Sequence, residues 1–277
     1  EIFALLGPNG SGKTTLFRLL CTLLPIQRGS VRIGGVDSRT NPLAVRSQIG
    51  IVFQSPSLDK KLTVDENIAC QGALYGIKGE ELKQRREELL RRLDLMDRRN
   101  DRCETLSGGL KRRVELAKGM LHRPRFLLLD EPSTGLDPAA RLSFWDAIRT
   151  MADDGMAILL TTHLLEEADK ADRVAIMSAG KIIAEGSPHD LRSEMGEGVV
   201  TVIANDVVHV ERLLRDELRL SPQRVQQQLR LKTDSPATLV PVLLEKLGDD
   251  ARSIVIGRPS LEDVFVTKTG QEFATDE

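Results

Sequence analysis

Apolar residues recur along the chain in short runs, and longer helical patterns lie between these runs. Helices are predicted from Lys13 to about Leu24, where Pro25 ends the pattern, and from Pro138 to about Asp153. Strands that alternate with helices predict a mainly parallel α/β sheet with its ligand at the carboxyl ends of the strands. The runs with the length of buried strands are EIFALL (1–6), IGIVF (49–53), RFLLLD (125–130) and AILLTTH (157–163).

Helical patterns dominate from about Thr63 to His122, which predicts a helical subdomain. Leu82, Leu89 and Leu93 fall on one face of a helix whose charges have both signs. Mixed signs favour a solvated helix face over a basic binding patch. A strand with a turn is predicted before the helical region, at 29–37. A hairpin with Gly180 in its turn is predicted after it, at 173–186.

The pattern of apolar and polar residues changes again after Ser187-Pro188. Three strand-like runs and two helical runs follow, so a small α+β domain is predicted over 195–277. It contains no catalytic constellation. A packing or dimer-stabilising role and a regulatory role both remain open for it. The strands are predicted at 199–204, 228–232 and 252–256, and the helices at 210–220 and 235–248.

Composition narrows the class of function. The net charge of −2 and the aromatic share of 3% give no reason to expect a nucleic-acid surface. The three cysteines form no CxxC pair, so a reducing cytoplasm is expected rather than a disulfide or zinc framework. No apolar run approaches the ~18 residues of a membrane span. Because Glu1 begins inside a strand-like run, we expect that an N-terminal piece is missing.

The first chemical motif is GPNGSGKT at 7–14, which fits the phosphate-loop pattern GxxxxGK[ST] completely. Glycines let successive backbone N–H groups face a phosphate, Lys13 neutralises β/γ charge, and the Thr14 hydroxyl can ligate Mg²⁺. An apolar strand precedes the motif and a helix follows it. Nucleoside triphosphate binding is therefore predicted. The residues of this loop are Gly7, Pro8, Asn9, Gly10, Ser11, Gly12, Lys13, Thr14 and Thr15.

An acidic pair, Asp130-Glu131, ends the apolar strand FLLL. One carboxylate can reach Mg²⁺ through water, and the next can polarise an attacking water. Kinases, GTPases, helicases and ATPases share these two motifs. The absence of an NKxD guanine motif weakens the GTPase alternative.

A second anion-binding signal, LSGG at 106–109, precedes the helical run VELAKGMLH. Ser107, Gly108 and Gly109 combine a hydroxyl, a flexible backbone and a helix N-terminus, which together suit a phosphate. Gln54 follows a strand, Ser133-Thr134-Gly135-Leu136-Asp137 follow the acidic pair, and His163 ends a later strand.

These motifs, in this order, resemble those of the ATP-binding cassette family, the nucleotide-binding subunits of ABC transporters. The resemblance covers residues 1 to about 190, and PSLEDVFVTKTG (259–270) is similar to the tail of bacterial drug-resistance exporters of the ABC-2 type. It implies an α/β fold of the P-loop NTPase class, of the ABC ATPase type with a helical subdomain over about 63–122, plus the small α+β C-terminal domain.

The resemblance also implies roles for individual residues. Glu131 is expected as general base, His163 as a γ-phosphate contact, and Gln54 as a contact to the metal and the water. Thr14, Gln54 and Asp130 are the expected Mg²⁺ partners. Ser107, Gly108 and Gly109 would contact the ATP held by a second subunit, and Asp137 would link the two subunits.

The implied partners are a second cassette, as a homodimer, and a separate membrane permease engaged through residues 54 to about 75. The chain is then expected at the cytoplasmic face of the membrane, where it powers export. Leu110 replaces the glutamine that usually ends the signature, and the upstream adenine-stacking aromatic has no counterpart here. The alternatives are a soluble ABC ATPase acting on nucleic acid or ribosomes, and a module that binds ATP without hydrolysing it.

Overall fold

The computed structural model describes residues 1–225 and 227–273. The chain divides into two compact units. The first contains Glu1–Leu5 and Gly12–His163, and the second contains Leu6–Ser11 and Leu164–Glu277. Each unit is described by itself.

The sheet of the first unit contains the predicted apolar strands. Its strands β4 (Ile49–Val52), β5 (Phe126–Asp130), β6 (Ala157–Thr162) and β1 (Ile2–Leu6) lie side by side in that order. The pairs β4–β5 and β5–β6 are parallel. Leu127 and Leu129 on one face of β5 are fully buried, and Leu128 on the other face is 4% exposed, as expected for a parallel strand that is covered on both faces.

Helix α1 (Lys13–Leu20) packs near β5 and β6, and it ends earlier than the sequence predicts. The expected end at Leu24 is wrong because Thr22 adopts a left-handed backbone with φ 58°. The N–H of Leu23 then bonds back to the carbonyl of Arg18 at 2.9 Å, and the N–H of Thr22 to that of Leu19 at 3.1 Å. This pattern is a Schellman ending, which satisfies the last carbonyls of the helix.

The predicted strand with a turn at 29–37 is a short hairpin. Strands β2 (Arg32–Ile33) and β3 (Val36–Asp37) pair in antiparallel fashion around Gly34 and Gly35, both with positive φ. Helix α2 (Pro42–Arg46) follows, with Asn41 as its N-cap.

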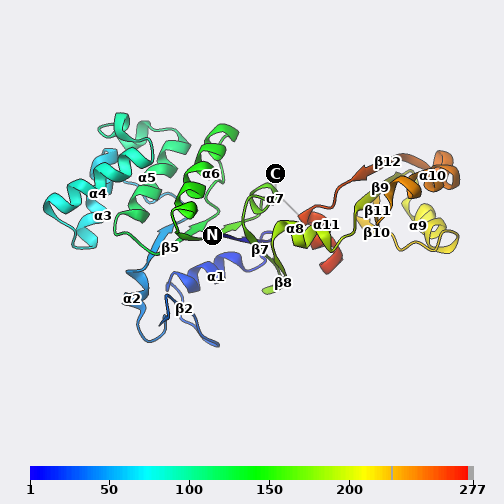
Figure 1. The fold of residues 1–277 in the computed structure, drawn as a ribbon, viewed down its shortest axis with the longest axis horizontal. Helices are drawn as coiled ribbons and strands as arrows, with labels where there is room; N and C mark the ends of the chain where they lie inside the picture. Colours follow the sequence, from blue (N-terminus) through cyan, green and yellow to red (C-terminus); the bar gives the residue numbers. More distant parts are fainter. Residues whose placement is uncertain (226, 274–277) are drawn as a thin grey trace. The chain divides into compact units, whose positions relative to one another are not determined.

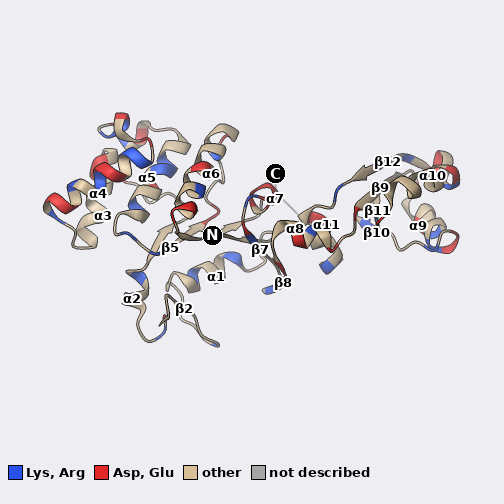
Figure 2. Cartoon of the chain, in the orientation of Figure 1, with Lys and Arg blue, Asp and Glu red and all other residues tan. Residues whose placement is uncertain are grey.

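The predicted helical region is confirmed. Helices α3 (Val64–Leu74), α4 (Gly79–Arg92) and α5 (Gly108–Met120) pack against one another, and Figure 1 shows them side by side. Short 3-10 turns at Met96–Arg98 and Cys103–Thr105 join α4 to α5. Figure 2 shows charges of both signs along α4, in line with a solvated face. Helix α6 (Pro138–Asp153) has the predicted bounds and packs on α5 and β6.

From Leu164 on, the second unit contains α7 (Leu165–Ala168) and then the predicted hairpin. Strands β7 (Arg173–Ser178) and β8 (Lys181–Gly186) pair in antiparallel fashion, and Gly180 at their turn has φ 77°. The short helix α8 (Pro188–Ser193) follows, capped by Ser187.

Residues 198–257 form an α+β module that we call the C-terminal module. Its elements run β9 (Gly198–Ala204), α9 (Val207–Asp216), β10 (Gln223–Val225), β11 (Gln228–Thr233), α10 (Pro236–Leu247), a 3-10 turn (Gly248–Asp250) and β12 (Ala251–Gly257). The sheet order is β10-β11-β9-β12, and all neighbours are antiparallel. This β-α-β-β-α-β arrangement is ferredoxin-like.

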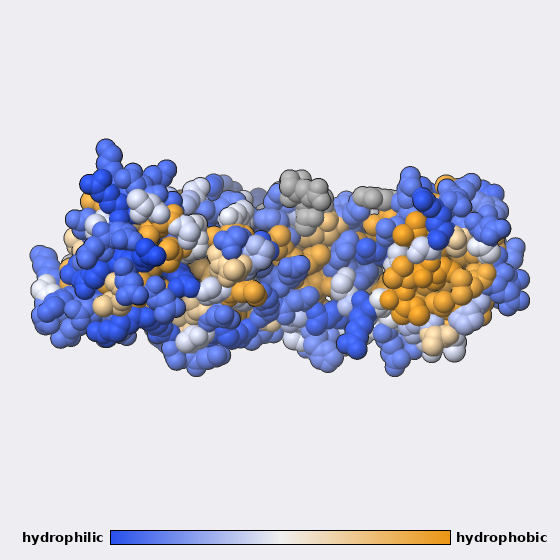
Figure 3. Space-filling model, turned by 90° about the horizontal axis from the view of Figure 1, so that it is seen from above, coloured by the Kyte–Doolittle hydropathy of each residue, from blue (hydrophilic) through white to orange (hydrophobic). Residues whose placement is uncertain are grey.

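The interior of the C-terminal module is built from one face of its sheet and its two helices. Val200, Val202, Val210 and Leu229 are fully buried there. The module also exposes apolar side chains, and Figure 3 shows an apolar area over it. The exposed large apolar residues of the module are Val208, Val242, Leu244, Val255 and Ile256.

The stretch PSLEDVFVTKTG contains α11 (Leu261–Thr269), which packs against α8. Ser260 and Asp263 form a capping box at its start. Across the described residues, none of the helices combines the length and the apolar character needed to cross a bilayer.

Candidate functional site

The phosphate loop has a tight backbone whose glycines could not be replaced by residues with side chains. Its residues Gly7 to Ser11 belong to the second unit. A Cβ on Gly7 would lie 2.6 Å from both the Met177 carbonyl oxygen and Ser11 Oγ, and Gly10 has φ 79°. Ser11 Oγ is buried and has no hydrogen-bond partner among the described residues. A tight loop with an unsatisfied hydroxyl suits a bound phosphate.

The loop leads into α1 of the first unit. Gly12 stands at the N-cap with φ 104° and offers no side chain to the N-terminal backbone N–H groups. Such N–H groups, together with the helix dipole, favour an anion. Thr14 is half-buried and Thr15 is exposed at this end of the helix. The sequence GKTT therefore places two hydroxyls beside the expected phosphate position.

Glu131 lies at the centre of the cluster of polar residues in the first unit. It follows β5, has φ 42° and is 8% exposed. Its Oε2 accepts a hydrogen bond from Gln54 Nε2 at 3.1 Å and lies 3.2 Å from His163 Nδ1. Its Oε1 lies 3.9 Å from Lys13 Nζ. Three residues that the sequence singled out from three other segments, Lys13, Gln54 and His163, therefore meet at the Glu131 carboxylate.

Asp130 and Thr161 are opposite each other on β5 and β6. Thr161 Oγ1 donates to Asp130 Oδ1 at 2.6 Å and accepts from the Glu131 N–H at 3.0 Å. Burial raises the pKa of Asp130, and the Thr161 hydrogen bond opposes that shift. Thr161 thus holds both members of the acidic pair at once.

Lys13 is 4% exposed and lies inside this cluster. Burial lowers its pKa, while Glu131 and Asp130 act in the opposite direction. A buried ammonium group is stable only where nearby negative groups compensate its charge, as Glu131 and Asp130 do here. The phosphates of a nucleotide would add to that negative charge.

The signature segment lies at the start of α5. Ser107 is the N-cap, and its Oγ accepts from the Leu110 N–H at 3.3 Å. Ser107 and Gly108 are exposed. A Cβ on Gly109 would lie 2.7 Å from the Ala140 Cβ, so α5 and α6 approach closely there.

Asp137 is the N-cap of α6 in the structure, and its carboxylate accepts from the Ala140 N–H at 2.9 Å. Its predicted role as a link between subunits stays a prediction.

Comparison with known proteins then decides the family. A family model described as ABC transporter matches residues 1–134. The chain is 38% identical to the daunorubicin/doxorubicin resistance ATP-binding protein DrrA of Streptomyces peucetius, over 97% of this chain and 84% of that protein. The chain belongs to the ABC transporter family.

Other relatives agree with this identification. The Nod factor export ATP-binding protein I of Rhizobium johnstonii is 36% identical over 98% of this chain and 87% of its own length. A solved ATP-binding subunit of an ABC transporter matches with a TM-score of 0.62 and 31% identity, covering 70% of this chain and 81% of that one. The cbiO1 structure from Clostridium perfringens matches with a TM-score of 0.64 and 28% identity, covering 79% and 84%. The predicted ABC ATPase fold is confirmed, and the chain is an ATP hydrolase by family.

The expected Mg²⁺ ligands of this ABC ATPase are hard oxygen donors, namely the Thr14 hydroxyl, the Asp130 carboxylate and the Gln54 amide oxygen. This donor set suits Mg²⁺. Gln54 Nε2 donates to Glu131 Oε2, so the Gln54 amide oxygen is the atom that would be available to a metal. Within the described residues there is no group of three or more His, Cys, Asp or Glu side chains that could hold a metal by itself. Phosphate oxygens and water would therefore complete the coordination, as is usual for Mg²⁺.

Sequence reasoning missed Thr161 and Arg112 in this ABC ATPase. Thr161 is followed by Thr162 at the end of β6, and its position opposite Asp130 depends on sheet register. Arg112 is buried on α5, with Val114, Leu116 and Ala117 following it. Arg112 stands between Lys111 and Arg113 in the sequence, so no pattern distinguished it from an ordinary charged helix face.

Proposed function

We propose that this chain binds and hydrolyses Mg-ATP as the motor subunit of an exporter, and that ATP drives the association of two copies. The relatives are named for drug resistance and for Nod factor export, which supports export as the direction of transport. These relatives are named for different compounds although their ATP-binding chains are similar. We therefore expect the membrane partner, rather than the ATP-binding chain, to select the cargo.

The observation that carries the proposal is the convergence of Lys13, Gln54 and His163 on Glu131. In the proposed step the Glu131 carboxylate takes a proton from a water molecule whose oxygen attacks the γ-phosphorus. The bond from that phosphorus to the β,γ-bridging oxygen breaks, and ADP leaves. Gln54 and His163 orient the water and the γ-phosphate.

Mg²⁺ would neutralise charge on the β- and γ-phosphates when bound. Thr14, Asp130 and Gln54 would hold it. Thr161 keeps the Asp130 carboxylate in place by its 2.6 Å hydrogen bond. The loop residues Gly7 to Thr15 would bind the phosphates through backbone N–H groups and Lys13.

The exposed Ser107 and Gly108, together with the half-buried Gly109, would complete the site of a second copy, with Asp137 at the contact between copies. A bridging γ-phosphate would then stabilise the dimer, and hydrolysis would remove that bridge. We expect a homodimer.

The partner of the dimer is proposed to be a separate multi-span permease, engaged through residues 54 to about 75, which places the chain at the cytoplasmic face of a membrane. Leu74 is 80% exposed and Tyr75 39% exposed at the end of α3, which gives this segment apolar surface for a partner. Co-purification should recover a multi-span membrane protein. Recovery of soluble partners alone, or salt-sensitive binding to nucleic acid, would favour the soluble ABC ATPase instead.

Turnover by Glu131→Gln tests the chemistry. The variant keeps the size of the side chain but removes the base, so hydrolysis should fall at least about 100-fold while ATP stays bound. Glu80→Gln on the exposed face of α4 is the matched control and should turn over like the natural chain. Equal rates in all three proteins would remove Glu131 from its role.

A further inference from the structure

Arg112 lies on α5, the helix that Ser107 caps, and is 6% exposed. Its guanidinium donates to backbone carbonyls of two separate segments. Nη1 donates to Phe53 O at 2.6 Å, while Nη2 donates to Glu131 O at 3.2 Å and to Asp130 O at 3.4 Å. Nε donates to Pro132 O at 2.5 Å. One side chain therefore joins the segment before Gln54 to the segment that contains Glu131.

Both contacted segments matter for hydrolysis. Phe53 immediately precedes Gln54, and Asp130 to Pro132 include the left-handed backbone of Glu131. Phe53 and Glu131 lie just beyond the ends of β4 and β5, and the planar guanidinium donates to the carbonyl of each. Only an arginine offers such a fork, because lysine is a single point donor.

Two more residues of α5 hold the same region. Glu115 Oε1 accepts from the Ser57 N–H at 2.7 Å and from the Ser57 hydroxyl at 3.0 Å. Lys118 Nζ donates to the Ser57 carbonyl at 2.7 Å. Gln54 is thus bounded on one side by the contact of Arg112 with Phe53 and on the other by the contacts of Glu115 and Lys118 with Ser57.

We propose that Arg112 is a positioning residue for ATP hydrolysis, which fixes Gln54 and Glu131 relative to the helix that begins at Ser107. It touches no reacting atom. Helix α5 carries Arg112, which positions Glu131, and begins at Ser107, which would contact the ATP of a second copy. Movement of α5 would therefore link the two ATP sites of a dimer. This inference rests on the proposed roles of Glu131, Gln54 and Ser107.

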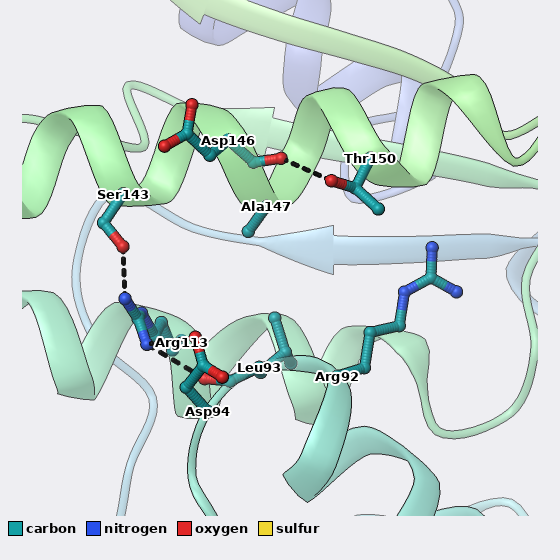
Figure 4. Close-up of a pocket in the computed structure, with 8 residues that line it drawn as sticks. All are labelled: Arg92, Leu93, Asp94, Arg113, Ser143, Asp146, Ala147 and Thr150. Carbon is teal, nitrogen blue, oxygen red and sulfur yellow. Dashed lines mark hydrogen bonds and ion pairs between the residues drawn. The ribbon is translucent and has the colours of Figure 1, made fainter.

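Arg112→Lys tests the inference, because lysine keeps the charge beside Glu115 and loses the fork. Arg113→Lys is the matched control from the next position of α5. Figure 4 shows the Arg113 side chain directed toward Ser143 of α6 and Asp94. It also donates to the carbonyl of Leu93 at 3.2 Å, so both variants lose arginine bonds to backbone.

The expected result is a split between kinetic constants. Arg112→Lys should lower kcat by about tenfold or more, since small displacements of catalytic groups are costly, while the KM for ATP and the thermal midpoint stay close to those of Arg113→Lys. Equal kcat in the two variants would overturn the proposal. So would a loss of folded protein, or a parallel loss of ATP affinity and midpoint, since either marks Arg112 as structural.

Glu131→Gln in the same assay separates this failure from failure of the proposed function. If Glu131→Gln loses turnover and Arg112→Lys does not, only the positioning role is wrong. If Glu131→Gln keeps its turnover, the assignment of the base is wrong and the positioning proposal falls with it.

Discussion

At the scale of residues, Glu131 combines an unfavourable backbone with a central position. Its φ of 42° is in the left-handed region, which costs a residue with a Cβ on the order of 1–2 kcal/mol. The Glu131 N–H compensates by bonding to the carbonyl and the hydroxyl of Thr161, at 3.1 and 3.0 Å. The Thr161 hydrogen bonds thus hold Glu131 in this backbone conformation, as the proposed role of its carboxylate requires.

Gly109 gives a residue-scale prediction that is independent of ATP. In Gly109→Ala the new Cβ would lie 2.7 Å from the Ala140 Cβ, so α5 and α6 must separate. The free energy of unfolding should fall by about 1–3 kcal/mol in urea denaturation. Gly108→Ala is the control, because its Cβ would meet only Leu136 Cδ2 at 3.5 Å. Equal losses in both variants would show that the α5–α6 contact is not the cause.

At the scale of elements, periodicity predicted the helices and strands but not all of their ends. Helix α9 begins at Val207 and ends at Asp216 instead of spanning 210–220, because Asp206 caps it. Strand β10 was missed since three residues, two of them polar, carry no apolar alternation. The motifs predicted which residues meet at Glu131, whereas the contacts of Thr161 and Arg112 depend on register and tertiary packing.

The caps of α11 and α10 give a matched element-scale prediction. The Ser260 side chain accepts from the Asp263 N–H at 3.2 Å, whereas Ser235 caps α10 without a side-chain bond. Ser260→Ala should lower the free energy of unfolding by about 1 kcal/mol and Ser235→Ala by less than about 0.5 kcal/mol. Urea unfolding followed by circular dichroism measures both. Trp145 fluorescence is unsuitable, because Trp145 belongs to the other unit. A larger effect at Ser235 would contradict the capping explanation.

At the scale of the whole molecule, one chain carries two segments suited to phosphate. The segment Gly7 to Thr15 includes Lys13, whose Nζ lies 3.9 Å from Glu131 Oε1, while Ser107 and Gly108 are exposed at the start of α5. The proposed resolution is that each ATP uses the loop of one copy and the signature of another. The backbone N–H of Leu110 donates to Ser107 Oγ, and this bond does not depend on the side chain at position 110. The apolar side chain of Leu110 should therefore not prevent the signature from binding the ATP of another copy.

The mass of the Glu131→Gln chain in solution tests this shared site most directly. Size-exclusion chromatography with light scattering should give the monomer mass of 30.7 kDa without nucleotide and about twice that mass with saturating Mg-ATP. The same variant carrying Ser107→Arg should bind ATP and stay monomeric, because the signature is blocked. A Glu131→Gln chain that binds ATP and keeps the monomer mass would contradict the proposal that two copies share each ATP.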